Sequence, residues 1–354
     1  MVARFASGLD RGHSPLIAPL AVSSGDPAGV GPEIALKAWA ARRTTGPCFL
    51  IVGDPATFEA EARRLDLPRP ALVSDPGAAA AVFPTAPALL PQACAAAVRP
   101  GTPDPANAPA VVKAISRAVD LTLRGETAGV VTAPISKSVL YQDGFAFPGH
   151  TEYLAELCKD AAGWPDPRGP VMMLTASGLR VALVTIHTPL ALAPALVTPD
   201  RVERVIRVTA DALTRDFGVT APRLALCGLN PHAGEDGALG SEEREVLNPL
   251  AERLRTDGVQ ISDALPADTL FHAEARAGYD AAIAMYHDQG LIPVKTLDFW
   301  AGVNVTLGLP IVRTSPDHGT GFDIAGRGIA RADSLIAALD LAAVMARARA
   351  RHEP

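Results

Sequence analysis

His187, His232 and His287 each stand just past the end of a short apolar run. Runs of this length that are bounded by Pro, Gly and Asn are typical of buried parallel strands, and ligands of open α/β sheets bind beyond the carboxyl ends of such strands. Three imidazoles at one edge of a sheet would suit a divalent metal ion with open coordination positions. Each histidine alone is more often an ordinary strand-end or loop residue, so the metal-site hypothesis depends on all three together.

Two cations occur inside apolar stretches further along the chain. Lys295 ends Ile292-Pro-Val-Lys and Arg313 ends Leu309-Pro-Ile-Val-Arg, and both stretches are expected to be strands. A cation in such surroundings is costly unless it pairs with an anion. The two side chains therefore either form ion pairs with protein carboxylates or bind a phosphate or carboxylate of a substrate. The neighbouring metal-site hypothesis favours the second interpretation.

Two further polar segments follow expected strands. Gly25–Gly31 is a glycine-rich turn that could hold a phosphate at a helix N-terminus, but its spacing is neither GxGxxG nor a P-loop, and an ordinary tight turn is favoured. His150 and Thr151 are expected to orient a substrate as hydrogen-bond donors. From spacing alone, Thr151 could equally be the N-cap of a helix over 152–159.

The order of elements indicates an α/β fold. Leu20–Ser23 and Phe49–Gly53 are expected strands, and helices are expected over 109–124 and 198–218. Strands that alternate with helices at this spacing form a mainly parallel sheet. At 354 residues the chain is longer than one hydrophobic core usually serves, so two domains are expected.

Composition argues against several classes of function. The chain is 48% hydrophobic and 20% charged, with a formal net charge of −6 and no basic stripe, so nucleic acid binding is not expected. No run approaches the roughly eighteen apolar residues of a membrane helix, and the first fifteen residues lack a signal-peptide core and are expected to be a frayed extension. A reduced, cytoplasmic compartment is expected from four scattered cysteines without a CxxC motif, which are Cys48, Cys94, Cys158 and Cys227.

Several long strings of the sequence carry a family resemblance. They are SSGDPAGVGPE, FPGHTEYLAE, CGLNPHAGEDGALGSEE, LPADTLF, MYHDQGLIPVKTL, GVNVTLGLP and RTSPDHGTGFDIAGRG. These strings resemble those of the 4-hydroxythreonine-4-phosphate dehydrogenases of pyridoxal-phosphate biosynthesis. The likeness runs in register from about Ala18 to about Ala346, so it covers nearly the whole chain.

The resemblance implies an architecture of two α/β/α domains with the active site in a cleft between them, as in isocitrate and isopropylmalate dehydrogenases. The cofactor-binding domain would comprise 1–132 and 290–354. A central domain of 133–289 would carry the metal ligands and the dimer interface, with approximate boundaries. The family also implies a homodimer whose active sites are shared between the subunits.

Roles for particular residues follow from the same resemblance. His187, His232 and His287 would hold one divalent ion, which could be zinc, magnesium, manganese or cobalt, across the dimer interface. Asp268 matches a further acid of the site, and the general base stays open among Lys295, Asp268 and His150. The residues implied to contact the substrate are His150, Thr151, Lys295, Asn304 and Arg313, of which the resemblance alone identifies Asn304.

The segment that begins at His318, Gly319 and Thr320 is similar to the adenosine-binding loop of isopropylmalate dehydrogenases. In that loop an acidic residue binds the ribose hydroxyls, and Asp323 falls at the acidic position. Because its carboxylate would repel a 2′-phosphate, NAD is expected as the cofactor in preference to NADP.

The reaction implied by the resemblance is the metal-dependent oxidation of 4-phosphooxy-L-threonine by NAD. Its product, 2-amino-3-oxo-4-phosphooxybutanoate, is a β-keto acid that loses CO2 to give 3-amino-2-oxopropyl phosphate. Two alternatives stay open: a related dehydrogenase for 4-phospho-threonate, 4-phospho-erythronate or a dihydrodiol, and a non-catalytic phosphate-binding protein. The complete set of histidines, Lys295 and Arg313 argues against the non-catalytic alternative.

Overall fold

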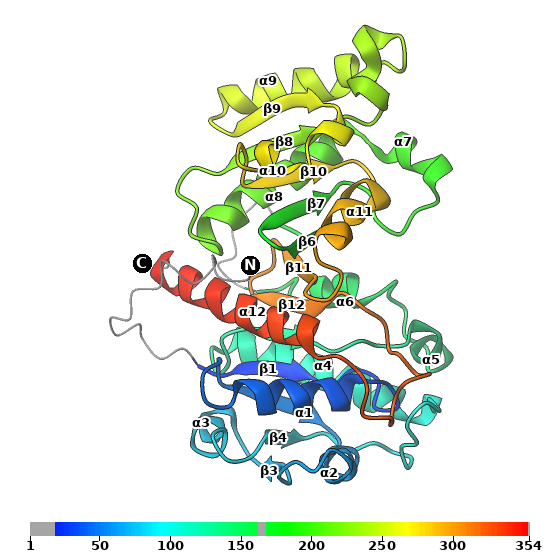
Figure 1. Cartoon of the computed structure of the whole chain (residues 1–354), viewed down its shortest axis with the longest axis vertical. Coiled ribbons are helices and arrows are strands. Elements are labelled where there is room, and N and C mark those ends of the chain that lie inside the picture. Colours follow the sequence, from blue (N-terminus) through cyan, green and yellow to red (C-terminus); the bar gives the residue numbers. More distant parts are fainter. Residues whose placement is uncertain (1–17, 162–167, 353–354) are drawn as a thin grey trace.

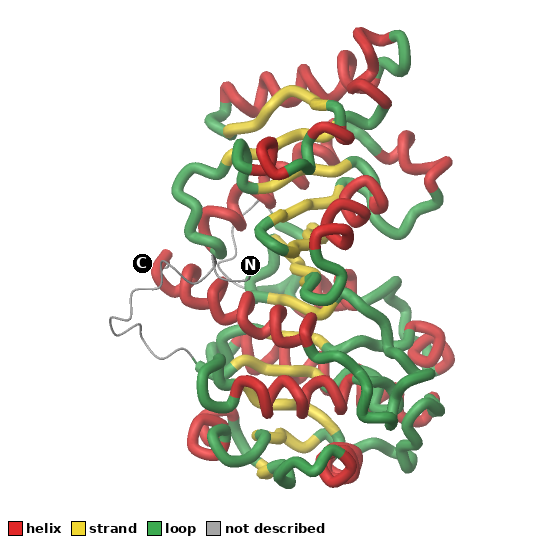
Figure 2. The backbone as a smooth tube through the Cα atoms, in the orientation of Figure 1, coloured by secondary structure: helices red, strands yellow, loops and turns green. Residues whose placement is uncertain are grey.

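One sheet of twelve strands runs through the molecule, with helices on both of its faces (Figure 1). The computed structural model describes residues 18–161 and 168–352, so the expected N-terminal extension lies outside the described residues. Figure 2 shows the strands stacked one above another, with helices and loops along both sides. The prediction of an α/β fold is confirmed.

The sheet consists of two parallel parts joined by an antiparallel centre. Neighbouring strands are parallel except at the β12–β11, β11–β6 and β6–β7 pairs. The prediction of a mainly parallel sheet is therefore confirmed. In spatial order the strands are β3 (Ala71–Leu72), β4 (Ala88–Pro91), β2 (Phe49–Gly53), β1 (Leu20–Ser23), β5 (Val130–Thr132), β12 (Arg313–Pro316), β11 (Val303–Leu307), β6 (Val171–Ala176), β7 (Leu179–Leu183), β10 (Ala281–Ala284), β8 (Arg223–Cys227) and β9 (Gln260–Leu265).

Helices cover the two faces of the sheet. The described chain forms α1 (Gly31–Arg42), α2 (Pro55–Arg64), α3 (Ala79–Val82), α4 (Ala108–Leu123), α5 (Lys137–Gln142), α6 (His150–Leu157), α7 (Ala193–Leu196), α8 (Pro199–Arg215), α9 (Asn248–Thr256), α10 (Ala273–Arg276), α11 (His287–Leu297) and α12 (Asp333–His352). Helices α1, α8 and α12 pack into one core, whereas α4 and α6, and separately α11, pack into cores on the other face. No helix in the described ranges is both long enough and apolar enough to cross a membrane.

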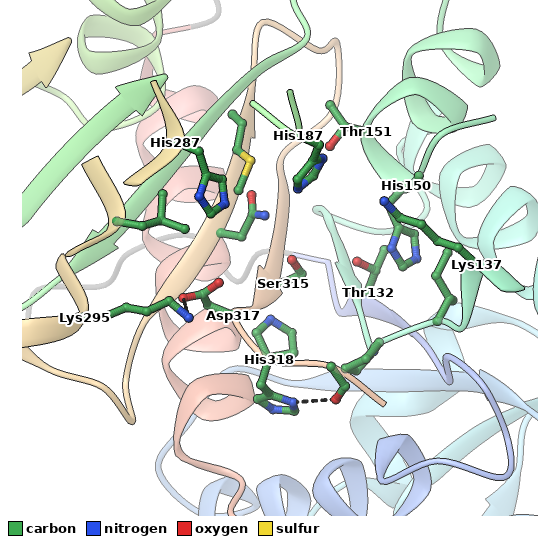
Figure 3. Close-up of a pocket in the computed structure, with 18 of the residues that line it drawn as sticks. Thr132, Lys137, His150, Thr151, His187, His287, Lys295, Ser315, Asp317 and His318 are labelled. Carbon is green, nitrogen blue, oxygen red and sulfur yellow. Dashed lines mark hydrogen bonds and ion pairs between the residues drawn. The ribbon is translucent and has the colours of Figure 1, made fainter. Parts of the chain in front are cut away.

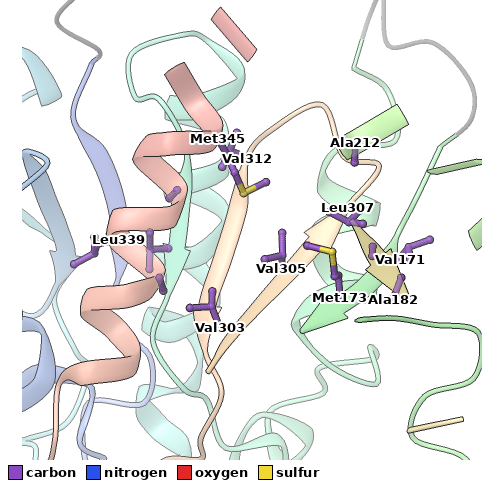
Figure 4. Close-up of a cluster of buried hydrophobic side chains, with 14 of the residues drawn as sticks. Val171, Met173, Ala182, Ala212, Val303, Val305, Leu307, Val312, Leu339 and Met345 are labelled. Carbon is purple, nitrogen blue, oxygen red and sulfur yellow. The ribbon is translucent and has the colours of Figure 1, made fainter. Parts of the chain in front are cut away.

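The alternation of side chains along β11 decides which residues reach the core. Val305 and Leu307 belong to the same buried cluster, in which Val305 lies on the side toward α12 and Leu307 lies beside Ala212 of α8 (Figure 4). Asn304 stands between apolar neighbours, so it points to the opposite face of the sheet. The register places Asn304 beside Ser315 of β12, and Arg313, two residues earlier, shares that face. The centre of the sheet therefore presents polar side chains on the face opposite α12.

Both apolar stretches that were expected to be strands differ in the structure. Lys295 lies in helix α11, where Leu291 and Val294 are buried while Ile292 is 64% exposed. This spacing of buried residues is helical, but the run contains no polar residue that would reveal the period in the sequence. The second stretch, 309–312, is a loop, and β12 begins only at Arg313.

The sheet is continuous across the expected domain boundaries. Strand β12 pairs with β5, and β11 pairs with β6, so the C-terminal segment contributes the strands that join the two parallel parts. The division into a domain of 1–132 and 290–354 and a domain of 133–289 stays a prediction. Strands β11 and β12 therefore lie where the two expected domains meet.

Candidate active site

A cavity of about 860 Å³ opens on the polar face of the central strands (Figure 3). Its walls come from the end of β5 and the segment after it, the start of α6, the segment after β7, helix α11, and strands β11 and β12. The expected site residues that line it are His150, Thr151, His187, His287, Lys295, Asn304, Arg313, His318 and Gly319. Those that do not line it are His232, Asp268, Thr320 and Asp323.

Arg313 is a buried cation without a carboxylate partner among the described residues. Its side chain is 2% exposed, and its two terminal nitrogens donate hydrogen bonds to Thr306 Oγ1 at 2.8 Å and Thr132 Oγ1 at 2.6 Å. Its Nε is buried and has no hydrogen-bond partner. Burial lowers the pKa of the guanidinium to about 10, and the charge of Glu152 partly opposes this shift. Arg313 is therefore charged at neutral pH, and none of the described carboxylates forms an ion pair with it.

Lys295, unlike Arg313, forms an ion pair with a carboxylate. Its Nζ lies 3.0 Å from Asp317 Oδ2, and it also lies 5.6 Å from the centroid of the Phe299 ring. Of the two interpretations that the sequence left open, an ion pair with a protein carboxylate is therefore present for Lys295. The charge of Asp317 reduces the attraction of this cation for a second anion.

His150 and Asn304 each direct an unsatisfied polar atom into buried space. The Nε2 atom of His150 and the Oδ1 atom of Asn304 are buried without a hydrogen-bond partner. Burial, and after it the charges of Arg313 and Lys137, hold the pKa of His150 well below its usual value, so the imidazole is neutral. Buried polar atoms in native proteins nearly always have a partner, so these two atoms indicate a polar ligand.

Thr151 lies in the first turn of α6, one residue after His150. Gly149 is the N-cap of this helix, and no side chain caps it. The interpretation of Thr151 as an N-cap is therefore wrong, and Thr151 lines the cavity beside His150.

His187 and His287 form a pair at one wall of the cavity. Their ring centroids are 5.8 Å apart, and the rings are inclined by 45°. The Nδ1 atom of His287 lies 2.7 Å from Asp288 Oδ1, which leaves Nε2 of that ring for another partner. Burial, followed by the charges of Lys137 and His287, lowers the pKa of His187, which favours the neutral imidazole that binds metals.

His232 does not join this pair. It lies in the segment η4 (Pro231–Gly237), whose backbone is not a right-handed helix because φ is positive from His232 to Asp236; His232 itself is exposed and has a φ of 52°. Within the described ranges, no three His, Cys, Asp or Glu side chains of the single chain are grouped closely enough to hold a metal ion. Three converging imidazoles were expected, whereas in the single chain His187 and His287 lie together and His232 lies apart from them. Asp268, in the short helix η6 (Ala267–Thr269), is likewise exposed.

The segment expected to bind the cofactor packs on the glycine-rich turn. Thr320 O accepts a hydrogen bond from Val30 N at 2.8 Å, and a Cβ atom at Gly29 would lie 2.7 Å from the same oxygen. Gly25–Gly31 therefore supports this segment through a close backbone approach that needs glycine. Asp323 is exposed and forms no hydrogen bond or ion pair with a described residue.

Lys137, Glu152, Ser315 and Asp317 also line the cavity, and the sequence analysis did not select them. Lys137 is the first residue of α5, a few residues beyond the end of β5. A lysine that follows a buried strand within a polar segment is a signal of the kind used for the histidines, so it could have been selected. Glu152 and Asp317 carry no such signal, because surface carboxylates are common in any sequence.

Comparison with known proteins gives consistent likenesses. Residues 46–342 match the model of the family described as pyridoxal phosphate biosynthetic protein PdxA. The 4-hydroxythreonine-4-phosphate dehydrogenase of Maricaulis maris (strain MCS10) is 60% identical over 343 residues, which cover 94% of this chain and 99% of the relative.

Two solved structures extend the comparison to the fold. The 4-hydroxythreonine-4-phosphate dehydrogenase from Klebsiella pneumoniae has a TM-score of 0.82 at 36% identity, and the match covers 93% of this chain and 99% of that one. A terephthalate 1,2-cis-dihydrodiol dehydrogenase from Burkholderia xenovorans LB400 has a TM-score of 0.62 at 31% identity, with coverage of 93% and 98%.

We expect Arg313→Met to keep or raise the melting temperature of the ligand-free protein, because it removes a buried cation that lacks a carboxylate. Arg349→Met is the matched control: Arg349 is also buried, but it donates to both Asp216 oxygens at 2.8 and 3.0 Å. Removing one partner of a buried pair is destabilising, so the control should melt earlier, although Asp216 keeps its second cation, Arg215 at 2.8 Å. Thermal denaturation followed by circular dichroism compares the two. An Arg313→Met protein that melts as early as Arg349→Met would show that Arg313 is a structural cation.

Proposed function

This chain belongs to the PdxA family of pyridoxal phosphate biosynthetic proteins, and we propose that it acts as a 4-hydroxythreonine-4-phosphate dehydrogenase. The substrate would be 4-phosphooxy-L-threonine, oxidised with NAD to 2-amino-3-oxo-4-phosphooxybutanoate, which loses CO2 to give 3-amino-2-oxopropyl phosphate. The observation that carries this proposal is Arg313, a buried cation without a counter-ion in a cavity that also contains a histidine pair.

The cavity has cationic groups for both anionic ends of this substrate. Arg313 can present a planar guanidinium to a phosphate or carboxylate, and Lys295 provides a second cation on helix α11. Asn304 adds an amide with an unsatisfied oxygen, which can accept a hydrogen bond from the substrate's ammonium group.

The histidine pair fits a divalent metal ion, because the two rings are close and Asp288 orients one of them. We propose that His187 and His287 of this chain are two of its ligands and that His232 is the third. Zinc, magnesium, manganese and cobalt are all compatible with imidazole ligands and open positions. Such an ion would supply Lewis-acid stabilisation of negative charge that develops on the substrate oxygen.

We further propose a homodimer in which each subunit completes the cavity of the other. Segment η4, which carries His232, packs against η6, which carries Asp268. Both side chains are exposed and lie outside the cavity of their own chain. Two neighbouring residues of the expected site would reach a cavity together if a second subunit presented it across a two-fold interface.

NAD is the proposed cofactor, with its ribose hydroxyls bound by Asp323. The carboxylate of Asp323 is exposed and pairs with none of the residues that the structure describes, so it is available to accept hydrogen bonds. The turn at Gly25–Gly31 holds the preceding residues in place through Val30 and Thr320. NAD would accept the hydride from the substrate's secondary alcohol.

The three candidates for proton transfer have different surroundings. Lys295 lies 3.0 Å from Asp317 at the cavity wall, and we propose it as a donor of the proton that replaces CO2. His150 is a neutral imidazole on the other side of the cavity in Figure 3. Asp268 lies outside the cavity of its own chain and could act only on the partner's cavity.

The proposed reaction is tested by NADH absorbance with 4-phosphooxy-L-threonine, NAD and a divalent metal. We expect turnover by the wild-type protein, and Arg313→Met should lower kcat/KM by at least about a hundredfold, roughly 2.7 kcal/mol of transition-state binding. NADH formation from 4-phospho-threonate or a dihydrodiol, but not from 4-phosphooxy-L-threonine, would instead establish the alternative substrate class, to which the likeness to a dihydrodiol dehydrogenase gives support.

Metal content tests the proposed ligands. His187→Ala, His232→Ala and His287→Ala should each lose bound metal and turnover but retain the fold, because each removes one of three ligands. His272→Ala is the control, since His272 caps the short helix α10 outside the cavity. Elemental analysis of the purified variants gives the readout. Full metal occupancy in any two of the three variants would contradict this site.

Cofactor preference tests the role of Asp323. Asp323→Ala should weaken the preference for NAD over NADP, because it removes both a ribose hydrogen bond and the repulsion of the 2′-phosphate. The expected effect is about 1–3 kcal/mol in the ratio of the two kcat/KM values. If that ratio is unchanged while turnover continues, another residue binds the ribose.

A further inference from the structure

The segment that leads from β12 to α12 (Figure 1) carries Asp323 and is attached to helix α1 at two places. Near its beginning, Thr320 O accepts a hydrogen bond from the backbone of Val30, the residue just before α1. Further along, three of its backbone groups bind side chains of α1. Asp323 lies between these two attachments, so the part of the segment that carries it is fixed at both ends to one helix.

Glu33 and Lys37, one turn apart on α1, make the second attachment. Lys37 Nζ donates hydrogen bonds to Gly328 O at 2.9 Å and to Ala330 O at 2.7 Å. Glu33 Oε1 accepts a hydrogen bond from Ala330 N at 2.8 Å, and the two side chains form an ion pair with each other at 2.7 Å. Both backbone groups of Ala330 are therefore bound by charged side chains, whose hydrogen bonds are stronger than those of neutral groups.

The carboxylate of Glu33 is buried, with 1% of its side chain exposed. Arg64 Nη2 lies 3.6 Å from its Oε2 atom and adds a second positive charge beside Lys37. Burying a carboxylate is costly even when it is paired, and apolar residues fill a core at lower cost. The same helix buries Ile34 and Leu36 in this way. A charged residue at position 33 is explained by the backbone amide of the segment, which needs an acceptor.

The attached segment has little regular structure of its own. Between Pro316 and Asp333 the described chain forms no helix or strand. Gly326 and Gly328 have φ angles of 75° and 72°, which are the left-handed region that favours glycine. Glycine loses more conformational freedom on ordering than any other residue. The conformation of this segment therefore depends on its attachments to neighbouring elements.

We propose that Glu33 and Lys37 are positioning residues for the cofactor, because they hold the segment in the conformation that presents Asp323. Neither side chain lines the described cavity, so neither contacts the substrate there. Without this attachment the segment would have to be ordered when the cofactor binds, and that loss of conformational freedom would weaken binding. The role of Asp323 rests on the proposed function, whereas the attachment rests on the hydrogen bonds of α1.

Steady-state kinetics of Lys37→Met test this role. We expect KM for NAD to rise about tenfold, while kcat and KM for 4-phosphooxy-L-threonine change by less than about twofold, because only the cofactor's segment is released. Lys37→Arg keeps the charge and the donors and should restore most of the loss. A fall in kcat with unchanged KM for NAD would overturn the proposal.

Arg42→Met is the matched control, since Arg42 is in the same helix. Its side chain is 32% exposed, against 29% for Lys37, and it forms an ion pair of 2.7 Å with Asp340 of α12 instead of binding the segment. This variant should keep the wild-type KM for NAD. An equal rise of KM for NAD in Arg42→Met and Lys37→Met would show a general loosening of α1 and would overturn the proposal.

Two measurements without turnover separate this inference from the proposed function. In the cofactor-free protein, amide hydrogen exchange over residues 319–331 should be at least about tenfold faster in Lys37→Met than in wild type or Arg42→Met. Calorimetry should then show about tenfold weaker NAD binding by Lys37→Met. Unchanged exchange, or faster exchange without weaker NAD binding, would overturn the positioning role. Both effects in a protein that does not oxidise 4-phosphooxy-L-threonine would refute the proposed substrate and leave this inference standing.

Discussion

The buried guanidinium of Arg313 imposes the main constraint on this structure. It stands at the first residue of β12 with 2% exposure, held by the hydroxyls of Thr132 and Thr306 and by no described carboxylate. A charge in that position is expensive to bury, and hydrogen bonds to two neutral hydroxyls do not neutralise it. No described carboxylate neutralises the positive charge of Arg313, and an anionic ligand would neutralise it. The unpaired charge destabilises the ligand-free protein, and an anion that pairs with it binds more tightly for the same reason.

The antiparallel centre of the sheet makes this arrangement possible. Strands β11 and β12 come from late in the chain and lie between the two parallel parts, and Asn304, Arg313 and Ser315 of these strands line the described cavity. Alternation along β11 sends Val305 into the core beneath α12 and Asn304 into the cavity. The same two strands thus join the two parallel parts of the sheet and carry side chains that line the cavity. Residues of α6 and of α11 line the same cavity.

The sequence allowed the prediction of the α/β fold, because strands and helices alternate along it. It also predicted an anion-binding role for Arg313 from the cost of burying a charge, and that role stays a proposal. It did not allow the correct local structure of Lys295, since an all-apolar run has no visible period, and the sequence cannot show that Asp317 lies 3.0 Å away. His232 illustrates another limit. A strand-end position predicts that a side chain reaches the edge of a sheet, but not which subunit's cavity it enters. Lys137 lines the cavity and was not selected, although a lysine in a polar segment after a buried strand is a signal of the kind used for the histidines.

The most direct measurement is a crystal structure of the protein with 4-phosphooxy-L-threonine bound. We predict that an anionic group of the substrate lies within hydrogen-bond distance of Arg313. It also predicts that Arg313 keeps its hydrogen bonds to Thr132 and Thr306, since the cation is already in place before the ligand binds. A complex in which Arg313 turns to a protein carboxylate such as Glu152, with the anionic groups of the substrate bound elsewhere, would show that Arg313 does not bind the substrate.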